Sequence, residues 1–171
     1  MNQAFVPDSF FAIRVTPQGG EPVLRALQTE AVGPFPAMKA LTFRGEYPFG
    51  WYTFQDPAVP VVVSLETFNP LIPLELRDSA IPCAIATVAV RNPGGKPVEV
   101  SVLATQQNAV GYTGAGAIGG RAHPAYGGNV NRIRRVKDGT FLAMTADGRK
   151  AGTPLPVSPL ARASRLSHDG M

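Results

Sequence analysis

Proline and glycine recur so often along this chain that they exclude long helices. The sequence holds 17 prolines and 18 glycines among 171 residues, about one residue in five. Proline removes a backbone donor and glycine weakens regular elements, so both residues favour turns. The segments between them are therefore expected to be short strands. Hydrophobic residues make up 44% of the chain and charged residues only 16%, which indicates a globular protein and not a disordered one.

The densest run of strand-forming residues lies between residues 43 and 82. A valine-rich segment near its centre predicts a strand over 61–68. The segment 69–74 that follows carries two prolines, which excludes a helix there. Its apolar side chains need a place to be buried, so we expect this segment to lie against a core. These side chains belong to Leu71, Ile72 and Leu74.

Further segments have the residue types and the alternation of strands. They are 9–15, 22–28, 38–47 and 141–145. The run 84–90 is apolar on both faces and is predicted to be a central strand, whereas 98–104 alternates and is predicted to be half-buried. The loop 92–97 between these two strands is expected to close a β-hairpin.

Short antiparallel strands without helical periodicity predict an all-β fold, an antiparallel two-sheet β-sandwich. We assign residues 1–145 to this sandwich and expect it to be incomplete. The segment 146–171 shows no packing pattern and contains several prolines. It is therefore predicted to be an extended or disordered tail.

The glycine-rich segment 111–128 contains a match to a dinucleotide-binding pattern, Gly114-Ala-Gly116-Ala-Ile-Gly119. That pattern must follow a strand and open a helix, whose N-terminus then holds the pyrophosphate. Further glycines and His123-Pro124 come next and cannot continue a helix. We interpret the segment as a surface loop, and we expect no cofactor.

The remaining polar residues indicate neither a metal site nor a nucleic-acid site. The single cysteine, Cys83, cannot form an intramolecular disulfide and lies in an apolar run, so it is interpreted as a small buried residue. A lone His123 in a flexible loop does not make a metal site. The formal net charge is +4, but the basic residues are scattered. The one basic run, 132–137, is interpreted as a solvated strand face at a sheet edge.

The sequence predicts no segment that enters a membrane. No stretch approaches the ~18 apolar residues that a spanning helix requires. The first residues also lack a basic region followed by an apolar run, so we expect no signal peptide and a cytoplasmic location.

Four aromatic residues stand close together in the sequence and are the candidate site. They are Phe49, Trp51, Tyr52 and Phe54. Flat rings can support the apolar C–H face of a sugar, or they can fill the space between two sheets or between two domains. Sugar contact and domain interface both stay open as interpretations.

Several short motifs follow one another in a specific order between residues 45 and 92. They are Gly45-Glu46-Tyr47-Pro48, the valine-rich strand, Phe68-Asn69-Pro70-Leu71-Ile72-Pro73-Leu74 and Asp78-Ser79-Ala80-Ile81-Pro82. In this order they resemble the N-terminal domain of glycoside hydrolase family 116, which includes the non-lysosomal glucosylceramidases, or bile-acid β-glucosidases. Asn69 stands where that family has Ser or Thr, and Asn initiates the same kind of turn. The resemblance covers roughly residues 10–145. Because a domain of that family is considerably longer than 171 residues, the chain looks like a fragment of it.

Glycoside hydrolysis needs two carboxylates, about 5 Å apart for retention and farther apart for inversion. The candidates are Glu46, Asp56, Glu66, Glu75, Asp78 and Glu99. Glu66 and Glu99 alternate with apolar residues and are predicted to be solvated, and Asp78 is predicted to cap its own turn. None of the six lies in a setting that would separate the pKa values of a pair. We therefore predict no catalytic residue.

The resemblance implies a supporting role. In that family the nucleophile and the acid/base belong to a helical-toroid catalytic domain, which this chain does not contain. We expect a non-catalytic portion of a β-glucosidase or glucosylceramidase that packs against this catalytic domain, and we expect hydrolysis from the parent protein. The alternative is a free-standing module that binds carbohydrate, such as glucosides, or another protein.

Overall fold

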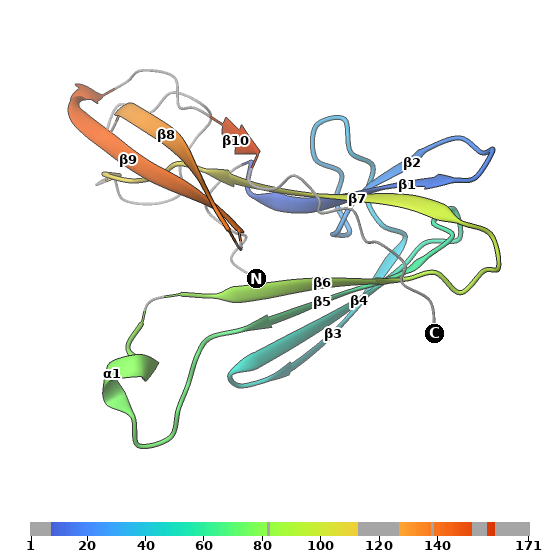
Figure 1. Cartoon of the computed structure of the whole chain (residues 1–171), viewed down its shortest axis with the longest axis horizontal. Coiled ribbons are helices and arrows are strands. Elements are labelled where there is room, and N and C mark those ends of the chain that lie inside the picture. The colour runs from blue at the N-terminus through green and yellow to red at the C-terminus, as the bar shows by residue number, and fades with distance from the viewer. Residues whose placement is uncertain (1–7, 82, 113–126, 138, 152–156, 160–171) are drawn as a thin grey trace. The chain divides into compact units, whose positions relative to one another are not determined.

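The computed structural model describes residues 8–81, 83–112, 127–137, 139–151 and 157–159. Antiparallel strands dominate these residues (Figure 1). The strands are β1 (Phe10–Pro17), β2 (Val23–Ala26), β3 (Ala40–Glu46), β4 (Phe49–Gln55), β5 (Val62–Phe68), β6 (Ile85–Arg91), β7 (Val98–Gln107), β8 (Gly127–Val136), β9 (Gly139–Ala151) and β10 (Val157–Pro159). A one-turn helix, α1 (Leu76–Ser79), lies between β5 and β6.

The chain divides into two compact units. The described residues of Ala12–Val102 form the first, which we call the sandwich unit. Those of Met1–Phe11 and Leu103–Arg162 form the second, which we call the hairpin unit. Strands β1 and β7 each contribute residues to both units.

Two sheets make up the sandwich unit. One has the strand order β3-β4-β5-β6, and the other contains β1 and β2 in the order β10-β7-β1-β2. The β1–β2 hairpin turns at Gly19, whose φ of 73° lies in the left-handed region that glycine adopts without strain. The all-β sandwich predicted from the sequence is confirmed.

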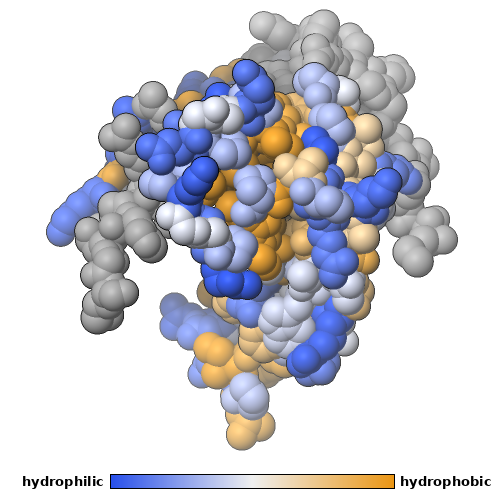
Figure 2. All heavy atoms as spheres, turned by 90° about the vertical axis from the view of Figure 1, so that its right-hand side faces the viewer, coloured by the Kyte–Doolittle hydropathy of each residue, from blue (hydrophilic) through white to orange (hydrophobic). Residues whose placement is uncertain are grey.

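An apolar layer lies between the two sheets of the sandwich unit. The most deeply buried side chains are Ile13 and Val15 from β1, at 1% and 0% exposed, and Val63 from β5, at 0%. Phe54 of β4 and Leu65 of β5 are buried in the same layer. In Figure 2, apolar residues gather in a strip flanked on both sides by hydrophilic residues, as expected where an apolar layer runs between two sheets.

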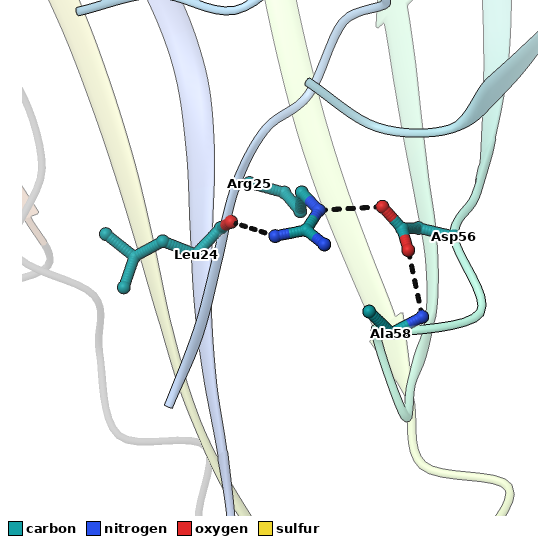
Figure 3. Close-up of polar contacts among 4 residues, drawn as sticks. All are labelled: Leu24, Arg25, Asp56 and Ala58. Atoms are coloured by element: carbon teal, nitrogen blue, oxygen red, sulfur yellow. Dashed lines mark hydrogen bonds and ion pairs between the residues drawn. The ribbon is translucent and has the colours of Figure 1, made fainter. Parts of the chain in front are cut away.

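An ion pair joins the two sheets at the border of this layer (Figure 3). Arg25 of β2 lies opposite Ile13 in the strand register, so both side chains project from the same face. Arg25 Nε donates to Asp56 Oδ2 at 2.7 Å, and Asp56 Oδ1 accepts from the backbone N of Ala58 at 2.9 Å. Arg25 Nη1 also donates to the carbonyl oxygen of Leu24 at 2.7 Å. Since Asp56 follows β4, the pair holds β2 against the second sheet.

The hairpin unit is built on β8 and β9, which pair antiparallel from Val136↔Gly139 outward, with an irregularity between Gly127 and Asn129. Asn108 is fully buried, and its Nδ2 lies within hydrogen-bond distance of the carbonyl oxygens of Val130 (3.3 Å) and Thr145 (3.0 Å). One amide therefore joins β8 and β9 to the end of β7. A buried polar group is tolerated there because its donors find acceptors.

The predicted strands mostly coincide with observed ones, but the connections between them differ. The segment 92–97 does not close a hairpin, because β6 pairs with β5 whereas β7 belongs to the other sheet. The loop instead carries the chain from one sheet to the other, and Asn92 folds it locally through Oδ1 to the N of Gly94 and Nδ2 to the O of Lys96. The prediction that 84–90 is a central strand is also wrong. Within the described residues, β6 is the edge strand of its sheet.

Three other predictions concern the apolar segment after β5, the glycine-rich segment and the end of the sandwich. The expectation that Leu71, Ile72 and Leu74 lie against a core is wrong, because they are 45%, 48% and 104% exposed. Residues 113–126 of the glycine-rich segment lie outside the described residues. The boundary at 145 stays a prediction; β9 continues past it to Ala151, and β10 pairs with β7.

Among the described residues, no helix has the length and apolar character needed to cross a membrane.

Two neighbouring valines of β5 provide a test of the sandwich. Val63 is fully buried and Val62 is 38% exposed. Thr has nearly the shape of Val and suits strands, so Val63→Thr buries a hydroxyl at constant volume and should cost about 1–3 kcal/mol. Val62→Thr should change the free energy of unfolding by less than about 0.5 kcal/mol. Urea denaturation of both variants checks this, and equal losses would show that the faces of β5 are misassigned.

The Arg25–Asp56 pair predicts a pH-dependent stability. The hydrogen bond from Arg25, and secondarily the Ala58 N–H and the charges of Arg25 and Lys39, lower the pKa of Asp56 against the opposing effect of burial. Because the pKa of Asp56 is lower in the folded than in the unfolded state, the ionised carboxylate stabilises the fold at pH values above the unfolded-state pKa of about 3.9. This stabilisation is lost as the pH falls through the folded-state pKa. Asp56→Asn should therefore cost about 1.5–3 kcal/mol at pH 7.

The cost of Asp56→Asn should shrink as the pH falls below about 4, because the wild-type carboxylate is then protonated first in the unfolded chain and, below its lowered folded-state pKa, in the folded chain as well. Urea denaturation at a series of pH values measures it. Asp78→Asn is the matched control, since Asp78 is exposed and makes no ion pair in the described part of the chain. A cost for Asp56→Asn that stays constant down to pH 2.5 would contradict the proposed role of the ion pair.

Candidate functional site

The sheet β3-β4-β5-β6 has one face turned to the apolar layer and one turned away from it. Phe54, Val63 and Leu65 occupy the inner face, so the residues that alternate with them form the outer face. The strand register arranges the outer face of β3, β4 and β5 in three rows. The rows are Thr42–Thr53–Ser64, Arg44–Trp51–Glu66 and Glu46–Phe49–Phe68.

The middle row is linked by direct polar contacts. Trp51 Nε1 donates to Glu66 Oε2 at 2.7 Å. The guanidinium carbon of Arg44 lies 4.7 Å from the centroid of the Trp51 ring, within the range of a cation–π contact. Arg44 Nε also pairs with Glu46 Oε1 at 3.0 Å, although both side chains are largely exposed. These contacts hold the indole between strands β3 and β5.

Aromatic rings extend the site into the third row. Phe49 stacks on Trp51 with a centroid distance of 5.4 Å and an interplanar angle of 11°. Phe49 also contacts Phe68, at 5.4 Å between centroids. Such aromatic pairs are worth about 0.5–1.5 kcal/mol beyond their buried area. The outer face therefore changes along the strands from hydroxyls, through charges, to aromatic rings.

An open hollow of about 530 Å³ lies at the first two rows, lined by Thr42, Arg44, Trp51 and Thr53. Thr42 and Thr53 are direct cross-strand partners and both are exposed. Neither hydroxyl makes a hydrogen bond with any other residue in the part of the chain that the structure describes. The hollow thus combines an indole, a guanidinium and two free hydroxyls.

The four aromatic residues singled out in the sequence divide between the two faces. Phe49 and Trp51 lie on the outer face, whereas Phe54 is only 4% exposed and belongs to the inner one. Tyr52 shares the inner face and contacts the ring of Phe43 at 4.8 Å. Because side chains alternate along a strand, one cluster in the sequence becomes two in space. A sugar or interface role for Phe49 and Trp51 stays a proposal.

Sequence reasoning missed the polar members of the outer face. Pairing residues 42–46 with 49–53 across the two-residue connection Tyr47-Pro48 would have placed Arg44 beside Trp51 and Thr42 beside Thr53. Glu66, predicted to be solvated, instead accepts the indole N–H. That partner lies on β5, and only the pairing of β4 with β5 brings it to Trp51.

Two of the remaining carboxylates, Glu75 and Asp56, have structural partners. Asp78 does not cap its turn as predicted; Glu75 caps α1 instead, with Oε1 accepting from the backbone N of Arg77 at 3.2 Å. Asp56 is engaged by Arg25. Among the described residues, no group of three His, Cys, Asp or Glu side chains is placed to hold a metal ion.

A second surface feature lies at the end of the same sheet. Residues 69–81 between β5 and β6, which we call the apolar loop, include α1 and extend beyond both strands (Figure 1). Asn69 closes its base, since its backbone N donates to the O of Pro48 at 3.2 Å and its Nδ2 to the O of Cys83 at 2.9 Å. Ser79 Oγ accepts from the N of Ile72 at 2.9 Å and donates to its O at 3.0 Å. The backbone of the loop is thus held by its own hydrogen bonds.

The side chains of the apolar loop are exposed despite this order. Leu74 is 104% exposed and Leu76 86%, and Leu74 has a φ of 68°, in the left-handed region that a branched side chain rarely adopts. Cys83, expected to be buried, is half-buried at the foot of the loop. Tyr47 in the neighbouring turn is 80% exposed.

The comparison with known families agrees with the resemblance noted in the sequence. Residues 1–160 match the family described as beta-glucosidase 2, glycosyl-hydrolase family 116 N-term. The match includes the strands of both sheets, the outer face and the apolar loop. The chain therefore belongs to the family of N-terminal domains of family 116 glycoside hydrolases.

Proposed function

We propose that this chain is a non-catalytic portion of a β-glucosidase- or glucosylceramidase-like hydrolase, and that it packs against and supports the catalytic domain. The observation that carries the proposal is the apolar loop, an ordered segment that exposes several large apolar side chains. Contiguous exposed apolar surface of this kind marks interaction sites in folded proteins. The membership in family 116 supports a catalytic domain as the partner.

The energetics of the apolar loop favour docking. Leu74 in the left-handed region costs about 1–2 kcal/mol, and the free chain gains no burial from its side chain. Burying Leu74 and Leu76 against a partner would stabilise a complex by about 1.5–3 kcal/mol each. The hydrogen bonds of Asn69 and Ser79 order the loop in advance, which reduces the entropy lost on binding.

The apolar surface continues from the loop onto the sheet. Phe49 and Ile85 are 39% and 41% exposed and lie at the same end of the sheet, in the row of Phe68. The third row and the apolar loop together form one surface, on which these apolar side chains stand beside the charged Glu46, Glu75, Arg77 and Asp78. We place the contact with the catalytic domain on this surface.

Two substitutions in the apolar loop test the docking. Leu74→Asp with Leu76→Asp places two charges on the proposed contact. The double substitution should weaken binding at least tenfold, because removing a charge from water at an apolar contact costs free energy. The measurement is calorimetric titration of the chain with the separately produced catalytic domain of a family 116 β-glucosidase. The double variant should keep its melting temperature, since both side chains are exposed in the free chain.

The matched control is Ile133→Asp on β8, which adds a charge to an apolar residue that is 66% exposed outside the loop. It should bind the catalytic domain like the wild type. Equal affinities of the wild type and the loop variant for the catalytic domain would contradict the proposed contact. Equal losses of affinity in the loop variant and the control would show a nonspecific effect of charge.

The chain by itself should hydrolyse no aryl β-glucoside above background. Hydrolysis needs a pair of carboxylates on either side of the scissile bond, whereas Asp56 and Glu66 are each held by a donor in the chain. Release of 4-nitrophenol from its β-glucoside measures this. Saturable turnover that disappears in Glu66→Gln or Asp78→Asn would contradict a supporting role.

A further inference from the structure

We infer that the hollow on the outer face of β3 and β4 binds a neutral saccharide. This site goes beyond the proposed domain contact. It uses the first two rows of the outer face, whereas the contact uses the third row and the apolar loop. The residues that line the hollow are Thr42, Arg44, Trp51 and Thr53.

The hydrogen-bonding groups of the hollow match a sugar. A threonine hydroxyl both donates and accepts, as a sugar hydroxyl does, and the paired Thr42 and Thr53 present two of them side by side. Arg44 pairs with Glu46 through Nε. Its two terminal nitrogens have no ion-pair or hydrogen-bond partner among the described residues. Four N–H groups therefore remain available to donate hydrogen bonds to the oxygens of a ligand.

The charges around the hollow select against anions. Arg44 supplies one positive charge, while Glu46 pairs with it and Glu66 lies in the same row as its partner Trp51. One cation beside two carboxylates leaves this part of the outer face with no excess of positive charge. Phosphates and nucleic acids need such an excess, whereas a neutral polyhydroxylated ligand does not.

Trp51 supplies the apolar part of the site in a fixed orientation. Its N–H is held by Glu66, and its ring is stacked on Phe49. Because the indole is ordered before a ligand arrives, little conformational entropy is lost on binding. Arg44 lies over the ring and Phe49 stacks on it. The indole atoms that line the hollow offer an apolar surface to the C–H groups of a pyranose, and the threonine hydroxyls suit its O–H groups.

The single tryptophan of the chain makes the site measurable. Cellotetraose titrated into the 171-residue chain should change the fluorescence of Trp51 saturably, and calorimetry should give the same affinity. Thr42→Val with Thr53→Val keeps the side-chain shape and the strand propensity but removes both hydroxyls. The loss of two hydrogen-bonding groups should weaken cellotetraose binding about fivefold or more, with an unchanged melting temperature.

The control is Thr87→Val, an exposed threonine on β6 that does not line the hollow. It should bind cellotetraose like the wild type. The loop variant Leu74→Asp with Leu76→Asp should also keep its saccharide affinity, so failure of docking and failure of this site are distinguishable. Absence of any heat and fluorescence change with cellotetraose would overturn the inference. Equal affinities in wild type and the double valine variant, or tighter binding of inorganic phosphate, would overturn it as well.

Discussion

The apolar layer between two sheets is the constraint on which the sandwich unit depends. Ile13, Val15 and Val63 are almost completely inaccessible to water, and burial of such side chains is the main favourable term in folding. The ion pair of Arg25 and Asp56 borders this layer, and its hydrogen bonds satisfy a carboxylate that is mostly withdrawn from solvent. Each charge is acceptable there only because the other is present.

Strand β4 connects this core to the candidate site. Its inward residue Phe54 is buried in the apolar layer, and its outward residues Trp51 and Phe49 form the centre of the outer face. The geometry of the site is therefore set by the sheet that holds the core. The orientation of Trp51 depends on neighbours from both adjacent strands, Arg44 on β3 and Glu66 on β5.

The apolar loop, unlike the core, exposes its apolar side chains to water. Leu74 and Leu76 are exposed, and Leu74 has a left-handed backbone conformation. Hydrogen bonds from Asn69 and Ser79 hold the backbone of the loop in place. Ordered apolar surface of this kind is intelligible as part of a larger assembly, which is consistent with the domain family to which the chain belongs.

The all-β class, the location of most strands and the family could be inferred from the amino-acid sequence. Dense proline and glycine and the alternation of residues are local signals, and they act before any strand has found a partner. The pairing of the strands, in contrast, depends on contacts between segments that are distant in the sequence. Segment 92–97 passes between sheets because β7 finds its neighbours in the sheet of β1, and apolar residues of 84–90 lie at a sheet edge. Trp51 meets Glu66 because β4 lies beside β5, and Leu74 is exposed because the loop that carries it extends beyond the strands that it joins.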